Sequence, residues 1–182
     1  MSYSPFSLVS AEIRQRAANI RLACFDVDGT LTDGRLYYDD NGGEFKAFHV
    51  RDGQGLALLR RFGFAVALIT ARTSLAVEKR AADLDLIART GVQDKLSCLR
   101  RLCEQHDITF GQVAFMGDDL PDFECLQNVG LAIAPADAHP WIGDIVHWKT
   151  RARGGEGAVR EACDLLLEAH DHLDTILGVS PQ

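Results

Sequence analysis

The sequence predicts an α/β fold: a doubly wound, Rossmann-like parallel sheet with a β-hairpin inserted after the first strand. Two observations carry this prediction. Short, nearly continuous apolar runs alternate with segments whose apolar residues recur at helical spacing, as in βαβ units. An Asn-Gly pair at 41–42 lies between two short strand-like runs, which is typical of a hairpin. No repeat or linker divides the 182 residues, so we expect a single domain over 1–182.

Each element follows from its local pattern. The first strand is apolar on both faces, as a strand buried between helix layers is. The helix expected near 54–61 stops at Gly63, and Pro121 suits the first turn of another helix. We expect strands at about 20–26, 64–70, 86–88, 112–117, 130–134 and 145–148. We expect helices at about 10–18, 54–61, 74–83, 94–106, 121–127 and 157–170.

Two further segments complete the expected organisation. The hairpin covers about 34–50, with strands at 36–38 and 44–50 around the turn 39–43. A C-terminal tail covers about 171–182, and we expect it to be disordered past Gly178.

Composition narrows the class of protein. The chain carries 19 basic and 26 acidic side chains, a net charge of −7, which argues against a nucleic-acid partner. No apolar run approaches the length of a membrane span, and Glu12 and Arg14 interrupt the region where a secretory signal would be apolar. Five cysteines without a Cys-x-x-Cys pair indicate buried, reduced thiols. We therefore expect a cytoplasmic protein without nucleic-acid or membrane partners.

Acidic side chains follow the predicted strands. Asp26 and Asp28 end the first strand, Thr70 ends the second, and Asp118 and Asp119 follow the strand near 112–117. The carboxyl ends of parallel strands share one edge of a sheet, where ligands bind. Carboxylates gathered there repel one another unless a cation lies between them, and all-oxygen ligands favour Mg²⁺.

The calcium-loop alternative fits poorly. The stretch DVDGTLTDG begins like an EF-hand loop, but Leu31 stands where the invariant glycine belongs, and a strand rather than a helix precedes it.

With a cation present, these residue types suit phosphoryl transfer. An aspartate can attack phosphorus, and a second aspartate two positions on can protonate the leaving oxygen and later deprotonate water. Thr70 offers a hydroxyl to the phosphoryl oxygens, and Lys95 offers a fixed positive charge. Taken alone, an Asp-x-Asp-Gly stretch is as often a turn, so the interpretation depends on the whole set.

Arginines are candidates for gripping an anionic substrate, because a guanidinium binds a carboxylate or phosphate in bidentate fashion. The alternative for each is a solvated surface side chain. The candidates are Arg51, Arg72, Arg80 and, in a glycine-rich turn before the last helix, Arg153.

At these positions the sequence resembles the haloacid dehalogenase superfamily of phosphohydrolases. Residues 26–31 match its first motif, Thr70 its second, Lys95 its third and 117–122 its fourth. The resemblance implies a nucleophile at Asp26 and a general acid/base at Asp28. It further implies that Mg²⁺ is held by the side chains of Asp26 and Asp118 and the backbone carbonyl of Asp28, with Asp119 and Asp122 behind these ligands.

Only about 25 residues separate the first motif from the helix expected near residue 54, so the resemblance is to the capless subclass. Segments 42–55, 68–72, 117–122, 136–140 and 153–167 are similar to capless members acting on 3-deoxy-D-manno-octulosonate 8-phosphate, a phosphorylated sugar acid of lipopolysaccharide precursor synthesis. Those members are homotetramers, whose C-terminal segments reach a neighbour's site.

Two alternatives remain open. A related enzyme on the same scaffold removes phosphate from a nine-carbon keto-deoxy sugar acid. A non-catalytic receiver-like or interaction domain also places an Asp, a Thr and a Lys on a parallel sheet. Asp28 argues against the receiver, which needs no general acid there.

Overall fold

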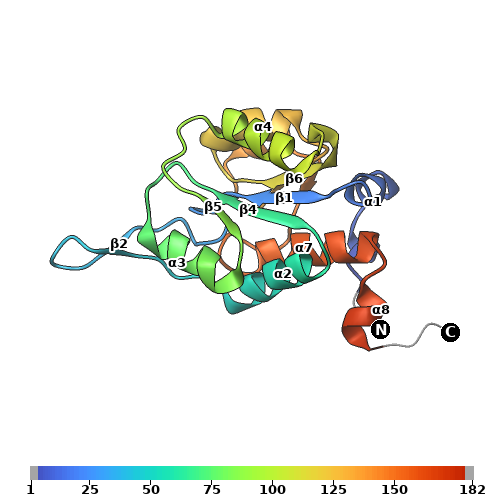
Figure 1. Ribbon diagram of the computed structural model, residues 1–182, viewed down its shortest axis with the longest axis horizontal. Coiled ribbons are helices and arrows are strands. Elements are labelled where there is room, and N and C mark those ends of the chain that lie inside the picture. The colour runs from blue at the N-terminus through green and yellow to red at the C-terminus, as the bar shows by residue number, and fades with distance from the viewer. Residues whose placement is uncertain (1–3, 179–182) are drawn as a thin grey trace.

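A six-stranded parallel sheet forms the centre of the computed structural model, which describes residues 4–178 (Figure 1). The strand order is β5-β4-β1-β6-β7-β8. The chain builds outward from β1 in both directions, so the connections reverse at β1, which confirms the doubly wound sheet. The strands are β1 Leu22–Phe25, β4 Ala65–Ile69, β5 Ile87–Arg89, β6 Val113–Met116, β7 Leu131–Ala134 and β8 Trp148–Lys149.

Helices cover both faces of the sheet, and Figure 1 shows α4 on one side with α2, α3 and α7 on the other. Alternate residues of β1 serve the two layers: Ala23 and Phe25 join one buried cluster, Leu22 and Cys24 the other. The first layer contains α1 Ala11–Ala17, α2 Val50–Arg61, α3 Leu75–Leu84 and α7 Ala158–Ala169. The second contains α4 Lys95–His106, α5 Phe123–Asn128 and α6 Pro140–Gly143.

Short elements lie outside the expected set. They are the 3-10 turns Pro5–Leu8, Phe110–Gln112 and Leu120–Asp122, the helix α6 and the helix α8 Leu173–Leu177. Helix α8 lies within the segment expected to be a tail, while the disorder expected past Gly178 falls outside the described residues. All five cysteines are buried and free, as expected. No helix within residues 4–178 is long and apolar enough to cross a membrane.

A hairpin of β2 Tyr37–Tyr38 and β3 Glu44–Phe45 projects from the sheet between β1 and α2 (Figure 1). The Asp39 side chain accepts hydrogen bonds from the backbone N–H groups of Asn41 (2.8 Å) and Gly43 (2.7 Å), which closes the turn. The rings of Tyr37 and Phe45 stack 5.6 Å apart across the strands. The hairpin is therefore confirmed, and the described residues between β1 and α2 include no cap domain.

The boundary between the hairpin and α2 differs from the expected one. The second hairpin strand ends at Phe45 rather than near residue 50, and α2 begins at Val50 rather than near 54. His49 caps the helix, because its Nδ1 accepts a hydrogen bond from the Arg51 N–H at 3.2 Å. Gly53 and Gly55 lie inside the helix, where a Cβ at Gly53 would meet the Arg80 guanidinium and a Cβ at Gly55 would meet the Cys163 side chain of α7 at 2.9 Å.

The amino end of α7 and the glycine-rich turn before it lie close to the loop that follows β1. Gly157, the N-cap residue of α7, has no side chain to cap the helix, and Asp52 of α2 substitutes by accepting a hydrogen bond from the Arg160 N–H at 2.7 Å. In the preceding turn, a Cβ at Gly154 would collide with the carbonyl oxygen of Gly29. The glycine-rich turn thus packs directly against the loop that follows β1.

Candidate active site

The three central strands bring their following residues to one pocket of about 290 Å³ at the carboxyl edge of the sheet. Asp26 follows β1, and its N–H donates to the Met116 carbonyl of β6 at 2.9 Å, so pairing of the strands extends to this residue. Thr70 follows β4, and Asp118 follows β6 by two positions. The expected convergence of strand ends is present, and Lys95, at the start of α4, also lines the pocket.

Lys95 lies between two buried carboxylates. Its Nζ donates to Oδ1 of Asp26 at 2.5 Å and to Oδ1 of Asp122 at 2.6 Å, and the three side chains are 3%, 9% and 2% exposed. Burial raises the pKa of Asp26 well above its ordinary value, repulsion from Asp122 adds to this, and Lys95 opposes it. Burial lowers the pKa of Lys95, but the two carboxylates outweigh it and raise the pKa to about 12. Lys95 is therefore a fixed cation at neutral pH.

Asp118 adds a second negative charge to this neighbourhood. Burial, together with repulsion from Asp122, raises its pKa to about 7, although Thr30 Oγ1 donates a hydrogen bond to Oδ1 at 3.1 Å. Carboxylate oxygens of Asp26, Asp118 and Asp122 all lie within 4.8 Å of one another. One lysine among three close carboxylates leaves excess negative charge, so a hard divalent cation such as Mg²⁺ fits this donor set.

The role of Asp122 is more specific than the sequence suggested. Its Oδ1 accepts from Lys95, and its Oδ2 accepts from the Asp118 N–H at 3.1 Å, so both oxygens are occupied. Asp122 thus holds Lys95 and the Asp118 loop together, and leaves Asp26 and Asp118 as the more available metal ligands. Asp119 lines the pocket but is exposed, and the hydrogen bonds of Lys95 among the described residues go to Asp26 and Asp122 instead.

The glycine after Asp28 has a geometric reason. Gly29 has a φ of +91°, a conformation that L side chains rarely adopt, and a Cβ there would collide with the Asp118 carboxylate. The loop after β1 therefore approaches Asp118 closely only because residue 29 is glycine.

Asp28 lies at the side of the pocket nearer the hairpin. Thr70 Oγ1 donates to its Oδ2 at 3.3 Å, and Lys46 Nζ donates to its Oδ1. Lys46 also lies 2.8 Å from Oε1 of Glu44, whose other oxygen is 2.5 Å from Nη2 of Arg72. Burial lowers the pKa of Lys46, but the bonds to Asp28 and Glu44 more than offset this and raise it.

Comparison with known proteins identifies the family. A scan against protein-family models found none that matches. The curated 3-deoxy-D-manno-octulosonate 8-phosphate phosphatase KdsC of Escherichia coli K12 is 45% identical over 173 residues, 94% of this chain and 92% of the relative. The chain belongs to the KdsC family.

Solved structures agree with this assignment. A crystal structure of a Xanthomonas campestris protein is 57% identical, with a TM-score of 0.96 and 98% of each chain covered. The Moraxella catarrhalis 3-deoxy-D-manno-octulosonate 8-phosphate phosphatase, solved with a magnesium ion, a phosphate ion and KDO, is 37% identical, with a TM-score of 0.91 over 93% of this chain and 98% of that one. The expected place of the KdsC family within the haloacid dehalogenase superfamily is confirmed.

The structure separates the four candidate arginines. Arg72 lines the pocket, and its buried Nε has no hydrogen-bond partner among the described residues. Arg80 lies over the Phe48 ring at 5.8 Å, Arg51 is exposed beside a different pocket, and Arg153 pairs with Asp137 at 3.2 Å. Of these four arginines, only Arg72 lines the pocket within a single chain. Substrate contact by the other three stays a prediction.

Lys46 is the residue that the sequence analysis missed. Glu44 and Lys46 stand two positions apart at the hairpin, which places both side chains on one face of a strand. That spacing was available from the sequence. What it lacked was the direction of the hairpin, which brings this face over Asp28.

Proposed function

We propose that this KdsC-family chain is a Mg²⁺-dependent phosphatase that hydrolyses 3-deoxy-D-manno-octulosonate 8-phosphate to the free sugar acid and phosphate. The observation that carries the proposal is the placement of Asp26 beside Asp118 and against Lys95, with Asp28 in the same pocket. The named activity of the E. coli relative, and the magnesium, phosphate and KDO in the M. catarrhalis structure, support the choice of cofactor and substrate.

The first half-reaction transfers the phosphoryl group to Asp26. Lys95 holds Oδ1, which leaves Oδ2 to attack phosphorus while the bond from phosphorus to the sugar oxygen breaks. Asp28 gives a proton to that leaving oxygen. Bound Mg²⁺, held by Asp26, Asp118 and the Asp28 carbonyl, would neutralise charge on the phosphoryl oxygens.

The second half-reaction regenerates the free carboxylate. Asp28, now deprotonated, takes a proton from water as the water oxygen attacks phosphorus, and the bond from phosphorus to Asp26 breaks. Lys95 stabilises the negative phosphoryl oxygens in both steps, because it lies at the pocket wall. The Thr70 hydroxyl has a single proton, which it donates to Asp28 Oδ2, so Thr70 acts by holding that carboxyl group. Asp122 keeps Lys95 in place. Asp119, which lines the pocket, would orient the water ligands of the bound metal.

Substrate recognition begins with Arg72. Its buried, unpartnered Nε is a donor available to the carboxylate of the sugar acid. We further propose that Arg51, Arg80 and Arg153 contact substrate in a neighbouring subunit's pocket, since none of the three lines the pocket of its own chain.

We also propose a homotetramer built around the hairpin, acting in the cytoplasm in lipopolysaccharide precursor synthesis. Large apolar side chains of the hairpin and its surroundings are exposed in the single chain, which favours burial against further copies. They are Leu36 47%, Tyr38 56%, Phe45 55%, Val50 81% and Leu75 81%. Light scattering coupled to size exclusion would show four chains, whereas a monomer would contradict the assembly.

The activity test compares wild type with Asp26→Asn, supplying Mg²⁺ and either the eight-carbon or the nine-carbon sugar acid phosphate. We expect phosphate release from wild type, preferentially from the eight-carbon substrate, and a loss of at least about 10⁴-fold in kcat for Asp26→Asn, since the nucleophile is removed. Asp107→Asn is the matched control, an exposed aspartate at the end of α4.

The outcomes separate the alternatives. No turnover by wild type contradicts the enzyme and favours a receiver-like domain. Faster turnover of the nine-carbon substrate reassigns the sugar while keeping the chemistry.

A further inference from the structure

Lys46 is a buried cation from an otherwise exposed hairpin. Its side chain is only 2% exposed, while Phe45 beside it is 55% exposed. Burying an ammonium group is costly unless it is paired, and Lys46 is paired twice, with Asp28 and with Glu44. The hairpin therefore places this side chain against Asp28 specifically.

Asp28 is held from two opposite directions. Lys46 donates to Oδ1 from the hairpin, and the Thr70 hydroxyl donates to Oδ2 from the end of β4 at 3.3 Å. The last torsion of an aspartate is broad and poorly restrained by its own rotamer preferences. Two donors on different oxygens fix that torsion, which decides where the carboxyl group presents its proton.

The other cations of the pocket are engaged elsewhere. Lys95 donates to Asp26 and Asp122, and Arg72 is paired with Glu44 and lies 3.4 Å from the Tyr38 hydroxyl. Of the described cations lining or contacting the pocket, Lys46 alone contacts the Asp28 side chain.

We propose that Lys46 is a positioning residue for the proposed phosphatase: its bond to Oδ1 holds the Asp28 carboxyl group so that Oδ2 carries the proton to the leaving sugar oxygen. Lys46 keeps its own protons throughout and acts only through Asp28. Glu44, fixed by Arg72, keeps the Lys46 side chain against the pocket. This inference rests on the proposed function, because it assigns a role within that reaction.

The test uses the dependence on the leaving group. A sugar alkoxide needs a proton as it leaves, whereas p-nitrophenolate leaves without one. Because kcat/KM reports steps up to the first irreversible one, it includes cleavage of the ester and omits hydrolysis of the phosphorylated enzyme. For Lys46→Met we expect kcat/KM to fall about 10- to 100-fold with the sugar acid phosphate. With p-nitrophenyl phosphate or acetyl phosphate we expect less than about a threefold change, since no general acid is required.

Two further variants sharpen the result. Lys46→Arg keeps a donor and a charge, so we expect it to retain most of the activity lost in Lys46→Met. Lys46→Ala should regain sugar phosphate turnover when ethylammonium is added. Lys79→Met is the matched control, because Lys79 forms an exposed ion pair with Asp83 away from the pocket. Circular dichroism and thermal melting check that each variant is folded.

Several results would overturn the inference. An equal loss with both classes of substrate, or a rise in KM at unchanged kcat, would show that Lys46 binds phosphate or sugar rather than positioning Asp28. Failure of the proposed function looks different, since wild type would then release no phosphate from any of these substrates.

Discussion

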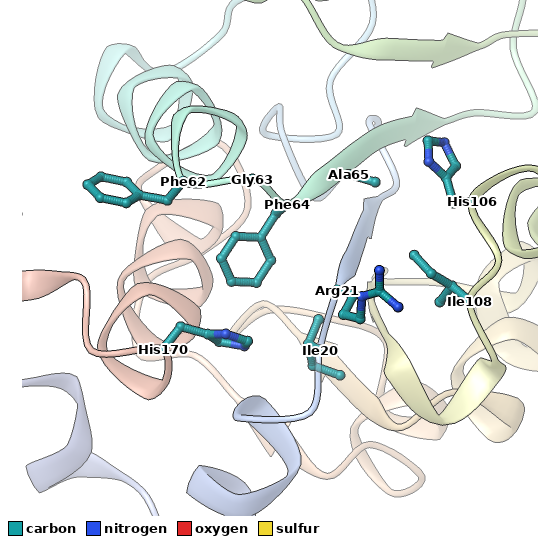
Figure 2. A pocket seen from close by; sticks show the side chains of 9 residues that line it. All are labelled: Ile20, Arg21, Phe62, Gly63, Phe64, Ala65, His106, Ile108 and His170. Carbon is teal, nitrogen blue, oxygen red and sulfur yellow. The ribbon is translucent and has the colours of Figure 1, made fainter.

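The two edges of the central sheet both carry a pocket, and the two pockets differ in chemistry. The carboxyl-edge pocket is lined by five aspartates together with Thr70, Arg72 and Lys95. The amino-edge pocket, of about 210 Å³, has no carboxylate in its lining (Figure 2). Its polar side chains are Arg21, His106 and His170, set among Phe62, Phe64, Ile20 and Ile108.

The helix termini explain this difference. At the amino edge α2, α4 and α7 end, and three lining residues are their last or capping positions: Phe62, His106 and His170. Positive charge is favourable beside helix carboxyl ends, and the Arg21 guanidinium supplies it at this edge. At the carboxyl edge α4 begins at Lys95, where the helix dipole favours anions. Among the described residues, the carboxyl edge combines buried charged side chains with converging loops. We therefore expect substitutions at that edge to change stability and activity more than substitutions at the amino edge.

The largest effect after loss of the nucleophile is expected at Lys95. Lys95→Met leaves Asp26 and Asp122 buried without their cation, which should lower the free energy of unfolding by about 3–5 kcal/mol in the absence of metal. Phosphate release should fall at least about 10³-fold, since the fixed charge is lost. Urea unfolding in a chelator measures the first effect. Lys79 is exposed, so Lys79→Met should change the free energy of unfolding by less than about 0.5 kcal/mol. An equal change in both variants would contradict a special role for the buried charges of the carboxyl edge.

Added Mg²⁺ should stabilise the protein in a pH-dependent way. In the folded chain the pKa of Asp118 is raised to about 7. At pH values between the ordinary pKa of an aspartate and 7, the folded state therefore binds a proton that the unfolded state has lost. The contribution of Asp118 to stability without metal therefore falls as the pH rises through this window. Mg²⁺ requires the ionised form, which is about a tenth of the population at pH 6 and about nine-tenths at pH 8, so affinity should be about tenfold weaker at pH 6.

Thermal melting with and without Mg²⁺ measures this dependence. The increase in melting temperature should be larger at pH 8 than at pH 6, and Asp118→Asn should remove most of it. An increase that is independent of pH, or that persists in Asp118→Asn, would place the cation elsewhere.

Much of the carboxyl edge was predictable from sequence, because strand ends are local features. The apolar run before Asp26 identifies a buried strand. A parallel sheet then places the carboxyl end of this strand beside the carboxyl ends of the strands that precede Thr70 and Asp118. Lys95 follows from the same logic as the first residue of a helix at that edge. Side-chain geometry was not needed to predict this set.

The remainder depends on contacts that no local pattern encodes. Lys46 reaches Asp28 across 18 residues through the orientation of the hairpin, and Arg80 lies over Phe48 rather than in the pocket. Helix α2 begins at Val50 because His49 caps it there, and Gly55 inside the helix packs against the Cys163 side chain of α7. Sequence therefore specified which edge is reactive, and tertiary packing decided which cations serve it.

The smallest effect is expected at the amino edge. Arg21→Gln combined with His106→Gln removes a guanidinium and an imidazole from that pocket and leaves the carboxyl edge untouched. We expect kcat/KM to stay within about twofold of wild type, and the free energy of unfolding to fall by less than about 1 kcal/mol as a favourable helix-terminus charge is lost. Steady-state phosphate release and urea unfolding measure the two quantities. A tenfold loss of kcat/KM in a variant of normal stability would show that the amino edge is coupled to catalysis. That result would contradict the expectation that only the carboxyl edge affects phosphate release.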